Sequence, residues 1–160
     1  MVIIVMGVSG SGKTTIGKML AEAMRWQFSD ADDFHSAANI EKMSHGISLT
    51  DSDRLPWLQT LHQVISEWLK TNTNAILACS ALKSEYRHLL QPTDEVKWVY
   101  LDGSFELIQQ RIRARHGHPI KESLLQSQFD ELEVPEDAIN VDISGTPEAS
   151  VRQISNNLSI

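Results

Sequence analysis

The stretch that decides the fold is Met1-Val-Ile-Ile-Val-Met-Gly-Val-Ser-Gly-Ser-Gly-Lys-Thr-Thr15. Its first residues form a short apolar run rich in β-branched side chains, a pattern typical of a strand that is buried on both faces. Residues 7–14 then match G-x-x-x-x-G-K-[ST] at every fixed position, and apolar residues recur at helical spacing after Thr14. A strand, a glycine-rich loop and a helix in this order predict a phosphate-binding loop.

The chemistry of this loop predicts a nucleotide site. Glycines permit backbone conformations in which several N–H groups turn toward one anion, and the following helix adds the positive end of its dipole. Lys13 is expected to reach the β- and γ-phosphates, and the Thr14 hydroxyl to coordinate Mg²⁺. The alternative, a glycine-rich turn with a chance lysine, does not account for the flanking strand and helix. The predicted nucleotide-binding residues are Gly7, Val8, Ser9, Gly10, Ser11, Gly12, Lys13, Thr14 and Thr15.

The length and the charge limit the classes of protein that fit. A chain of 160 residues without repeats or linkers predicts one domain spanning residues 1–160. Its net charge of −7 argues against a nucleic acid or an anionic membrane as the main partner. Cys79 is the only cysteine, which favours a reducing compartment. With no apolar run of transmembrane length, and a strand expected from residue 2, we expect a cytoplasmic protein.

The rest of the chain alternates between strand and helix patterns. Further strands are expected at residues 26–29, 75–79, 96–101 and 138–143. Helices are expected at residues 36–45 and 83–90, beyond Pro56, after Ser104, around Leu125 and after Thr146, with residues 49–56 as a polar turn. This alternation predicts an α/β fold with a central parallel sheet between two helical layers.

A phosphate loop leaves the reaction open, and three classes of nucleotide-binding protein can be compared. A GTPase would carry an N-K-x-D segment, which this chain lacks. A motor or helicase would carry acidic residues at the end of an apolar strand, whereas the strand at 75–79 is followed by Ser80. A small-molecule kinase fits best, with an acceptor site beyond the second strand and an arginine-bearing lid.

The sequence resembles the gluconate kinase family, small P-loop kinases related to shikimate kinase. The resemblance rests on collinear segments, of which Asp53-Arg-Leu-Pro-Trp-Leu58 and Cys79-Ser-Ala-Leu-Lys83 are more specific than the phosphate loop. Other matching segments are Asp30-Ala-Asp-Asp-Phe-His35, Asn39-Ile-Glu-Lys-Met43 and Arg115-His-Gly-His118. The resemblance implies a three-layer P-loop kinase fold with a mobile lid at about residues 112–130, and a homodimer.

Two carboxylates follow the second expected strand. Asp30 and Asp32 lie at the carboxyl end of that strand, where open α/β sheets place their ligands. By resemblance to the D-x-D of shikimate kinase-like enzymes, Asp32 is expected to orient the acceptor hydroxyl and take its proton, and Asp30 to help hold Mg²⁺. The alternative is that both carboxylates cap the turn that follows. His35 is expected either to donate to a substrate hydroxyl or to serve as a solvated or capping histidine.

The carboxylate of a sugar acid requires a cationic partner. Arg54 and Arg87 are the expected clamps because a guanidinium pairs with a carboxylate through two parallel hydrogen bonds. Lys83 is expected to assist with either the substrate or the γ-phosphate. For Arg54 the alternative is a surface ion pair with Asp51 or Asp53.

Three arginines precede the break at Gly117. Arg111 and Arg115 share one helix face, whereas Arg113 points elsewhere. We expect Arg111 and Arg115 to cover the ATP phosphates or stack on adenine, with Arg115 supplying charge during transfer. The alternative is a solvated face.

The resemblance thus implies an ATP- and Mg²⁺-dependent kinase that converts D-gluconate to 6-phospho-D-gluconate. Two alternatives are a kinase for another small acid, of shikimate type, and a non-catalytic nucleotide-binding switch.

Overall fold

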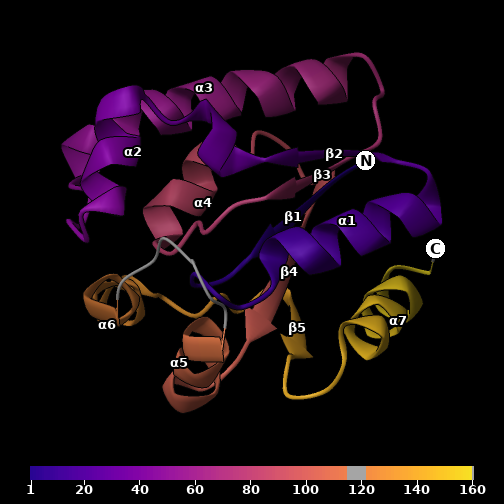
Figure 1. The fold of residues 1–160 in the computed structure, drawn as a ribbon. Helices are drawn as coiled ribbons and strands as arrows, with labels where there is room; N and C mark the ends of the chain where they lie inside the picture. Colours follow the sequence, from indigo (N-terminus) through magenta and orange to yellow (C-terminus); the bar gives the residue numbers. More distant parts are fainter. Residues whose placement is uncertain (115–121, 160) are drawn as a thin grey trace.

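The computed structural model describes residues 1–114 and 122–159. The sheet contains five parallel strands in the order β2-β3-β1-β4-β5. Helices cover both of its faces (Figure 1), so the predicted three-layer α/β fold is confirmed. The strands are β1 (Val2–Met6), β2 (Gln27–Asp30), β3 (Ala75–Ala78), β4 (Val96–Asp102) and β5 (Ile139–Asp142). The helices are α1 (Lys13–Met24), the 3₁₀ turn η1 (Ala31–Phe34), α2 (Ala37–Ser44), α3 (Asp51–Lys70), α4 (Ser84–Leu90), α5 (Phe105–Ala114), α6 (Glu122–Glu131) and α7 (Pro147–Leu158).

The core consists of two apolar layers separated by the sheet. In β1, Ile4 packs into the layer beneath α3 and α4, whereas Ile3 packs into the layer beneath α1, α5 and α7. All five residues of β1 are fully buried, because a central parallel strand has helices on both faces. The apolar run that opens the sequence is therefore the middle of the sheet.

The start of α3 differs from the sequence-based prediction. The polar turn expected at residues 49–56 is mostly helix, since α3 begins at Asp51 and contains Pro56. Thr50 and Asp53 form a capping box in which each side chain accepts the other's backbone N–H, and this arrangement starts the helix. Pro56 is inside α3, where it has no backbone N–H to donate to the preceding turn, and the helix nevertheless continues to Lys70.

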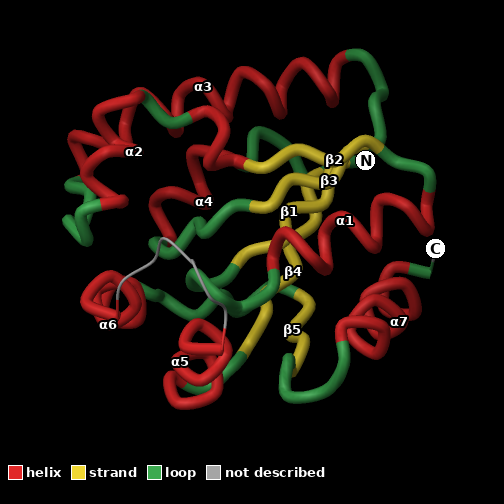
Figure 2. Tube along the Cα trace, in the orientation of Figure 1, coloured by secondary structure: helices red, strands yellow, loops and turns green. Residues whose placement is uncertain are grey.

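The strand ends and the loops that follow them form the edge of the sheet at which a site can be built. The turn after β1, the start of η1 after β2 and the segment after β3 lie at the same edge, as the trace shows (Figure 2). α6 lies beside this edge, although it is far from these loops in sequence. In the part of the chain that the structure describes, none of the helices has the length and apolar composition of a membrane-spanning segment.

Candidate active site

The phosphate loop has the backbone shape that its glycines predict. Gly10 and Gly12 have φ angles of 80° and 98°, in the left-handed region that side chains disfavour. A Cβ atom at Gly10 would also lie 2.7 Å from Ile112 of α5, so this helix packs directly on the loop. α1 starts immediately after Gly12 and directs its N-terminus at the space above the loop. The loop and the N-terminus of α1 therefore have the arrangement of an anion-binding site.

Lys13 lies at the base of a cavity of about 430 Å³ between the phosphate loop, η1 and α2. Its Nζ donates to the Val8 carbonyl of the same loop at 2.9 Å. Burial lowers the pKa of Lys13, and the nearby carboxylate of Asp32 opposes this shift. Burial likewise raises the pKa of the Asp32 carboxyl, and the charge of Lys13 opposes this shift. The Asp32 side chain nevertheless keeps 72% of its surface accessible. The structure thus brings the two predicted catalytic groups to one cavity.

Thr14 and Asp30, the predicted Mg²⁺ pair, lie in contact. The Thr14 hydroxyl donates to Asp30 Oδ2 at 3.0 Å, and Asp30 Oδ1 accepts the backbone N–H of Asp32 at 2.9 Å. A hydroxyl and a carboxylate beside the phosphate site are the hard oxygen ligands that Mg²⁺ takes, usually together with phosphates and water. Within residues 1–114 and 122–159, no cluster of three or more His, Cys, Asp or Glu side chains could hold a metal alone. The residues present fit Mg²⁺ carried by a nucleotide.

A second cavity of about 70 Å³ shares Lys13 and Asp32 with the first and leads away from the phosphate loop. His35 lines it with a side chain that is only 3% exposed and stacks on Trp57 at 4.1 Å between ring centroids. The Trp57 indole is held by a 2.7 Å hydrogen bond to the Ala31 carbonyl. Burial lowers the pKa of His35 to about 4, so the ring is neutral near pH 7. His35 is therefore part of the cavity wall and not a solvated residue.

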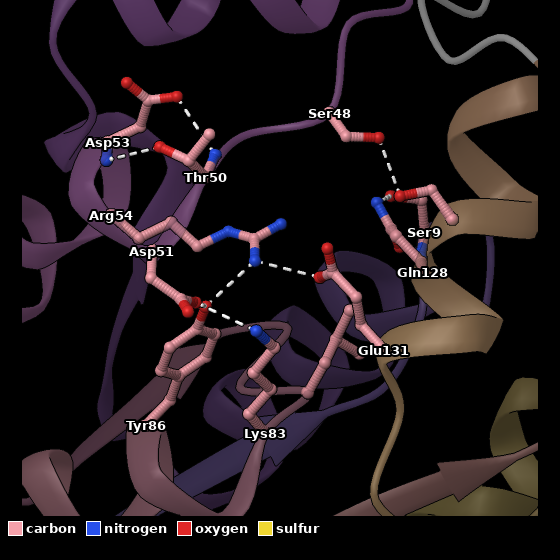
Figure 3. A network of polar contacts seen from close by, with 12 residues as sticks. Ser9, Ser48, Thr50, Asp51, Asp53, Arg54, Lys83, Tyr86, Gln128 and Glu131 are labelled. Carbon is pink, nitrogen blue, oxygen red and sulfur yellow. Dashed lines mark hydrogen bonds and ion pairs between the residues drawn. The ribbon is translucent and has the colours of Figure 1, made fainter.

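Arg54 also lines the second cavity, and its guanidinium lies between Tyr86 and Glu131 (Figure 3). Arg54 Nη1 donates to the Tyr86 hydroxyl at 3.0 Å and lies 2.8 Å from Glu131 Oε2 of α6. The contact with Glu131 is an ion pair without hydrogen-bond alignment, since Glu131 Oε2 has no hydrogen-bond partner among the described residues. The partner of Arg54 is thus neither Asp51 nor Asp53, the two acids considered from sequence.

Two other predicted substrate residues lie outside this cavity. Lys83 forms a 2.9 Å ion pair with Asp51, which also accepts a hydrogen bond from the Tyr86 hydroxyl. Arg87 donates to the backbone carbonyls of Ala81, Leu82 and Glu133, so its guanidinium joins the start of α4 to the segment after α6. In this structure Lys83 and Arg87 therefore make contacts within the protein around the site. Their contact with a substrate stays a prediction.

Arg111 lines a third cavity of about 230 Å³ on the other side of the phosphate loop, with Gly12, Thr15 and Pro147. Its guanidinium donates to the Ile143 carbonyl just after β5. The sequence predicts that Arg111 either covers the ATP phosphates or stacks on adenine, and both roles stay predictions. Arg115 and residues 116–121 of the expected lid lie outside the described residues.

Three residues of the site were not found from the sequence. Gln128 of α6 accepts from the Ser9 backbone N–H at 2.7 Å and donates to the Ser9 hydroxyl at 2.9 Å. Glu131 lies one turn further along the same helix, and Asn39 is buried behind His35. Polar residues on helices are normally solvated, and no local motif links Gln128 or Glu131 to segments distant in sequence. For Asn39 the available signals were its place in a segment that matches the family and its spacing of four residues from His35.

Comparisons with known proteins agree over nearly the whole chain. The profile of the shikimate kinase family matches residues 9–157. The thermosensitive gluconokinase of Escherichia coli is 44% identical over 146 residues, covering 88% of this chain and 78% of that protein. A sugar kinase from a Janibacter species matches with a TM-score of 0.94 and 41% identity, covering 99% of this chain and 94% of that one. A gluconokinase from Sinorhizobium meliloti matches with a TM-score of 0.84 and 38% identity, covering 98% and 94%.

Proposed function

The chain belongs to the shikimate kinase family and, within it, to the gluconokinases, and we propose that it phosphorylates D-gluconate with ATP to give 6-phospho-D-gluconate. The observation that carries this proposal is the second cavity, in which Asp32, His35 and Arg54 converge beside Lys13. This cavity brings together the Asp32 carboxylate, which accepts hydrogen bonds, the neutral His35 imidazole and the Arg54 cation. These are the groups that a polyol carboxylate requires next to a phosphate site.

Each of these side chains has a defined part in the proposed transfer. The phosphate loop and Lys13 bind the phosphates of ATP and balance the charge that develops on them. Asp32 orients the acceptor hydroxyl, which attacks the γ-phosphorus while the bond to the ADP oxygen breaks in line. The hydroxyl proton passes to Asp32. Mg²⁺ bound near Thr14 and Asp30 would neutralise phosphate charge.

Arg54 is the proposed partner of the gluconate carboxylate. Its side chain is 12% exposed and lines the same cavity as Ser9 and Lys13 of the phosphate loop. A charged group held in such surroundings interacts more strongly with a substrate anion than a surface arginine does. Because Glu131 already lies against Arg54, the substrate carboxylate must either replace Glu131 or bind beside it.

An acceptor panel tests this proposal. The purified protein is incubated with Mg²⁺ and ATP, and ADP release is measured with gluconate, shikimate, other sugar acids and nucleoside monophosphates. We expect turnover with gluconate above all others, and none in a folded Lys13→Ala variant, which controls for contaminating kinases. Preference for shikimate would favour the other small-acid kinase, and nucleotide binding without turnover on any acceptor would favour the switch module.

The expected homodimer and cytoplasmic location are parts of the same proposal. Light scattering coupled to gel filtration would test the first, with a mass near 36 kDa, twice the 18.0 kDa of one chain, as the expected result. Fractionation of cells that express the protein would test the second.

A further inference from the structure

The buried amide of Asn39 lies directly behind His35. Asn39 is on α2 and is only 6% exposed, although most residues of that helix face solvent. Its Nδ2 lies 2.9 Å from the backbone carbonyl oxygen of Asp53 and 3.3 Å from His35 Nδ1. One amide nitrogen thus joins the first turn of α3 to the ring that lines the acceptor cavity.

The Asp53 carbonyl determines which way this amide points. A carbonyl oxygen only accepts, so the atom of Asn39 that faces it must be the NH₂ group. The opposite orientation would place the Asn39 oxygen against another oxygen and leave both without a donor. The second N–H of the same NH₂ group is then the one that meets His35 Nδ1, and a donor at that position requires Nδ1 to accept.

We propose that Asn39 is a positioning residue that holds His35 with its proton on Nε2, so that the ring presents a fixed hydrogen-bond donor to a hydroxyl group of the acceptor. His35 Nε2 lies 3.8 Å from Asp32 Oδ1, which is too long for a direct hydrogen bond. A hydroxyl bound between them donates to the carboxylate and accepts from Nε2–H, which satisfies all three groups. This inference rests on the proposed function.

Two properties of the site keep this donor fixed. The stacking of His35 on Trp57 at an interplanar angle of 14° keeps the ring from turning. Among the described residues, the charged side chains that line the cavity with His35 are Lys13, Asp32 and Arg54. Burial together with Arg54 lowers the pKa of His35 to about 4. Near pH 7 the ring therefore has one proton, and its location decides whether Nε2 donates or accepts.

The protonated nitrogen can be observed directly. Long-range ¹H–¹⁵N spectra of protein labelled at histidine nitrogen distinguish the two neutral forms, and the His35→Gln variant identifies the His35 signals. For the wild type without substrate we expect a protonated Nε2 and a bare Nδ1 from pH 6 to 8. A protonated Nδ1, or a ring that titrates within this range, would overturn the inference even if the enzyme phosphorylates gluconate.

Substitutions at Asn39 test the cause. In Asn39→Asp the new carboxylate accepts from Nδ1 and should draw the proton there, whereas Asn39→Ala should leave a mixture of the two forms. Lys42→Met is the matched control, because Lys42 also joins α2 to Asp53, through its carboxylate at 2.9 Å, without touching His35. If the proton of His35 stays on Nε2 in Asn39→Ala, or moves equally in Lys42→Met, the Asn39 amide does not determine its location.

Kinetics then test the use of the donor. Loss of one hydrogen bond to a hydroxyl should raise the gluconate KM of Asn39→Ala by about three- to tenfold and leave the ATP KM unchanged. Lys42→Met should keep both values. If the ring changes form while the gluconate KM stays at the wild-type value, the substrate does not use Nε2–H. If the wild type lacks activity on gluconate but has the expected ring, the proposed function fails and the role of Asn39 in placing the proton stands.

Discussion

At the scale of single residues, the site depends on groups that influence one another across short distances. Lys13 and Asp32 share one cavity. Asp32 raises the pKa of Lys13 and Lys13 lowers the pKa of Asp32, so each favours the charged form of the other against the effect of burial. Arg54 is held by both Tyr86 and Glu131. Substitutions that keep the shape of a side chain and change one property are therefore the most informative.

Asp32→Asn keeps the size of the side chain and removes the carboxylate that accepts the proton. We expect kcat to fall by roughly 10²- to 10⁴-fold, with a much smaller change in the gluconate KM. Steady-state kinetics measure both values. Asp33→Asn removes the same charge from the next residue of η1 and is the control. A loss of similar size in both variants would indicate a general effect of charge in place of a specific role for Asp32.

Arg54→Lys keeps the charge and removes the planar pair of donors. The gluconate KM should rise by about 10- to 100-fold, the range for a lost hydrogen bond to a charged group, while the ATP KM stays nearly unchanged. An uncharged polyol of similar length should be a poor substrate for the wild type and should lose less in the variant. Equal impairment with both acceptors would show that Arg54 does not bind the carboxylate.

His35 makes stability depend on pH. Its pKa is about 4 in the folded protein, against 6.5 for an exposed histidine, so between these values the unfolded chain binds a proton that the folded chain does not. Stability should therefore fall as the pH drops from 6.5 to 4, by at most about 3 kcal/mol. Urea unfolding of the wild type and of His35→Gln across this range should show a shallower decline in the variant. Parallel curves would contradict the assignment.

At the scale of elements, the start of α3 is the feature that the sequence-based prediction placed wrongly. Proline removes a backbone donor, and for this reason the sequence predicts a helix boundary at Pro56. The pattern Thr50-x-x-Asp53 is itself a helix-start signal, because the two side chains satisfy two backbone N–H groups at the start of the helix. The capped first turn contains both Asp53 and Arg54. The capping box thus fixes the position of a predicted substrate residue.

Thr50→Ala removes the side-chain acceptor of this box. Unfolding free energy should fall by about 0.5–2 kcal/mol, the usual cost of a lost N-cap. Thr60→Ala in the middle of α3 is the matched control, since the Thr60 hydroxyl only donates back to the Pro56 carbonyl on an exposed face. Because alanine favours helix there, Thr60→Ala should be neutral or stabilising. Urea titrations give both values, and a neutral Thr50→Ala would show that the cap does not stabilise α3.

At the scale of the whole molecule, α6 connects the two sides of the site. Gln128 contacts Ser9 of the phosphate loop, and Glu131 contacts Arg54 of the acceptor cavity. We expect a ligand that displaces either contact to shift α6, which the other ligand also meets. Nucleotide and acceptor binding should therefore be coupled through this helix.

Calorimetry with gluconate and a non-hydrolysable ATP analogue measures this coupling. Each ligand should change the affinity for the other by the same factor, about fivefold or more. Gln128→Ala should bring the factor close to one. Gln126→Ala is the control on the same helix, because Gln126 bonds Asp130 within α6 and leaves the loop untouched. A factor that is equal in Gln128→Ala and the wild type would show that coupling takes another route.

Most of the fold could be predicted from the sequence, and about half of the site. β1 and the phosphate loop are local patterns, and Thr14 and Asp30 meet because parallel strands end at one edge of the sheet. Asn39 lies only four residues after His35, so its contact with that ring has local spacing. The contacts of Gln128 with Ser9 and of Glu131 with Arg54 depend on which helix packs beside which segment. Such contacts arise from the tertiary arrangement and leave no periodicity or spacing in the sequence.

The central place of β1 also has a consequence for how the protein is made. Val2 pairs with Ala75 on one side and with Val96 on the other, so β1 leaves the ribosome long before either neighbour exists. Until residues 96–102 emerge, its five apolar residues have no second strand beside them, and a nascent chain in that state is prone to aggregate. Burial of the strand at the middle of the sheet is thus completed late in synthesis, only after β4 has emerged.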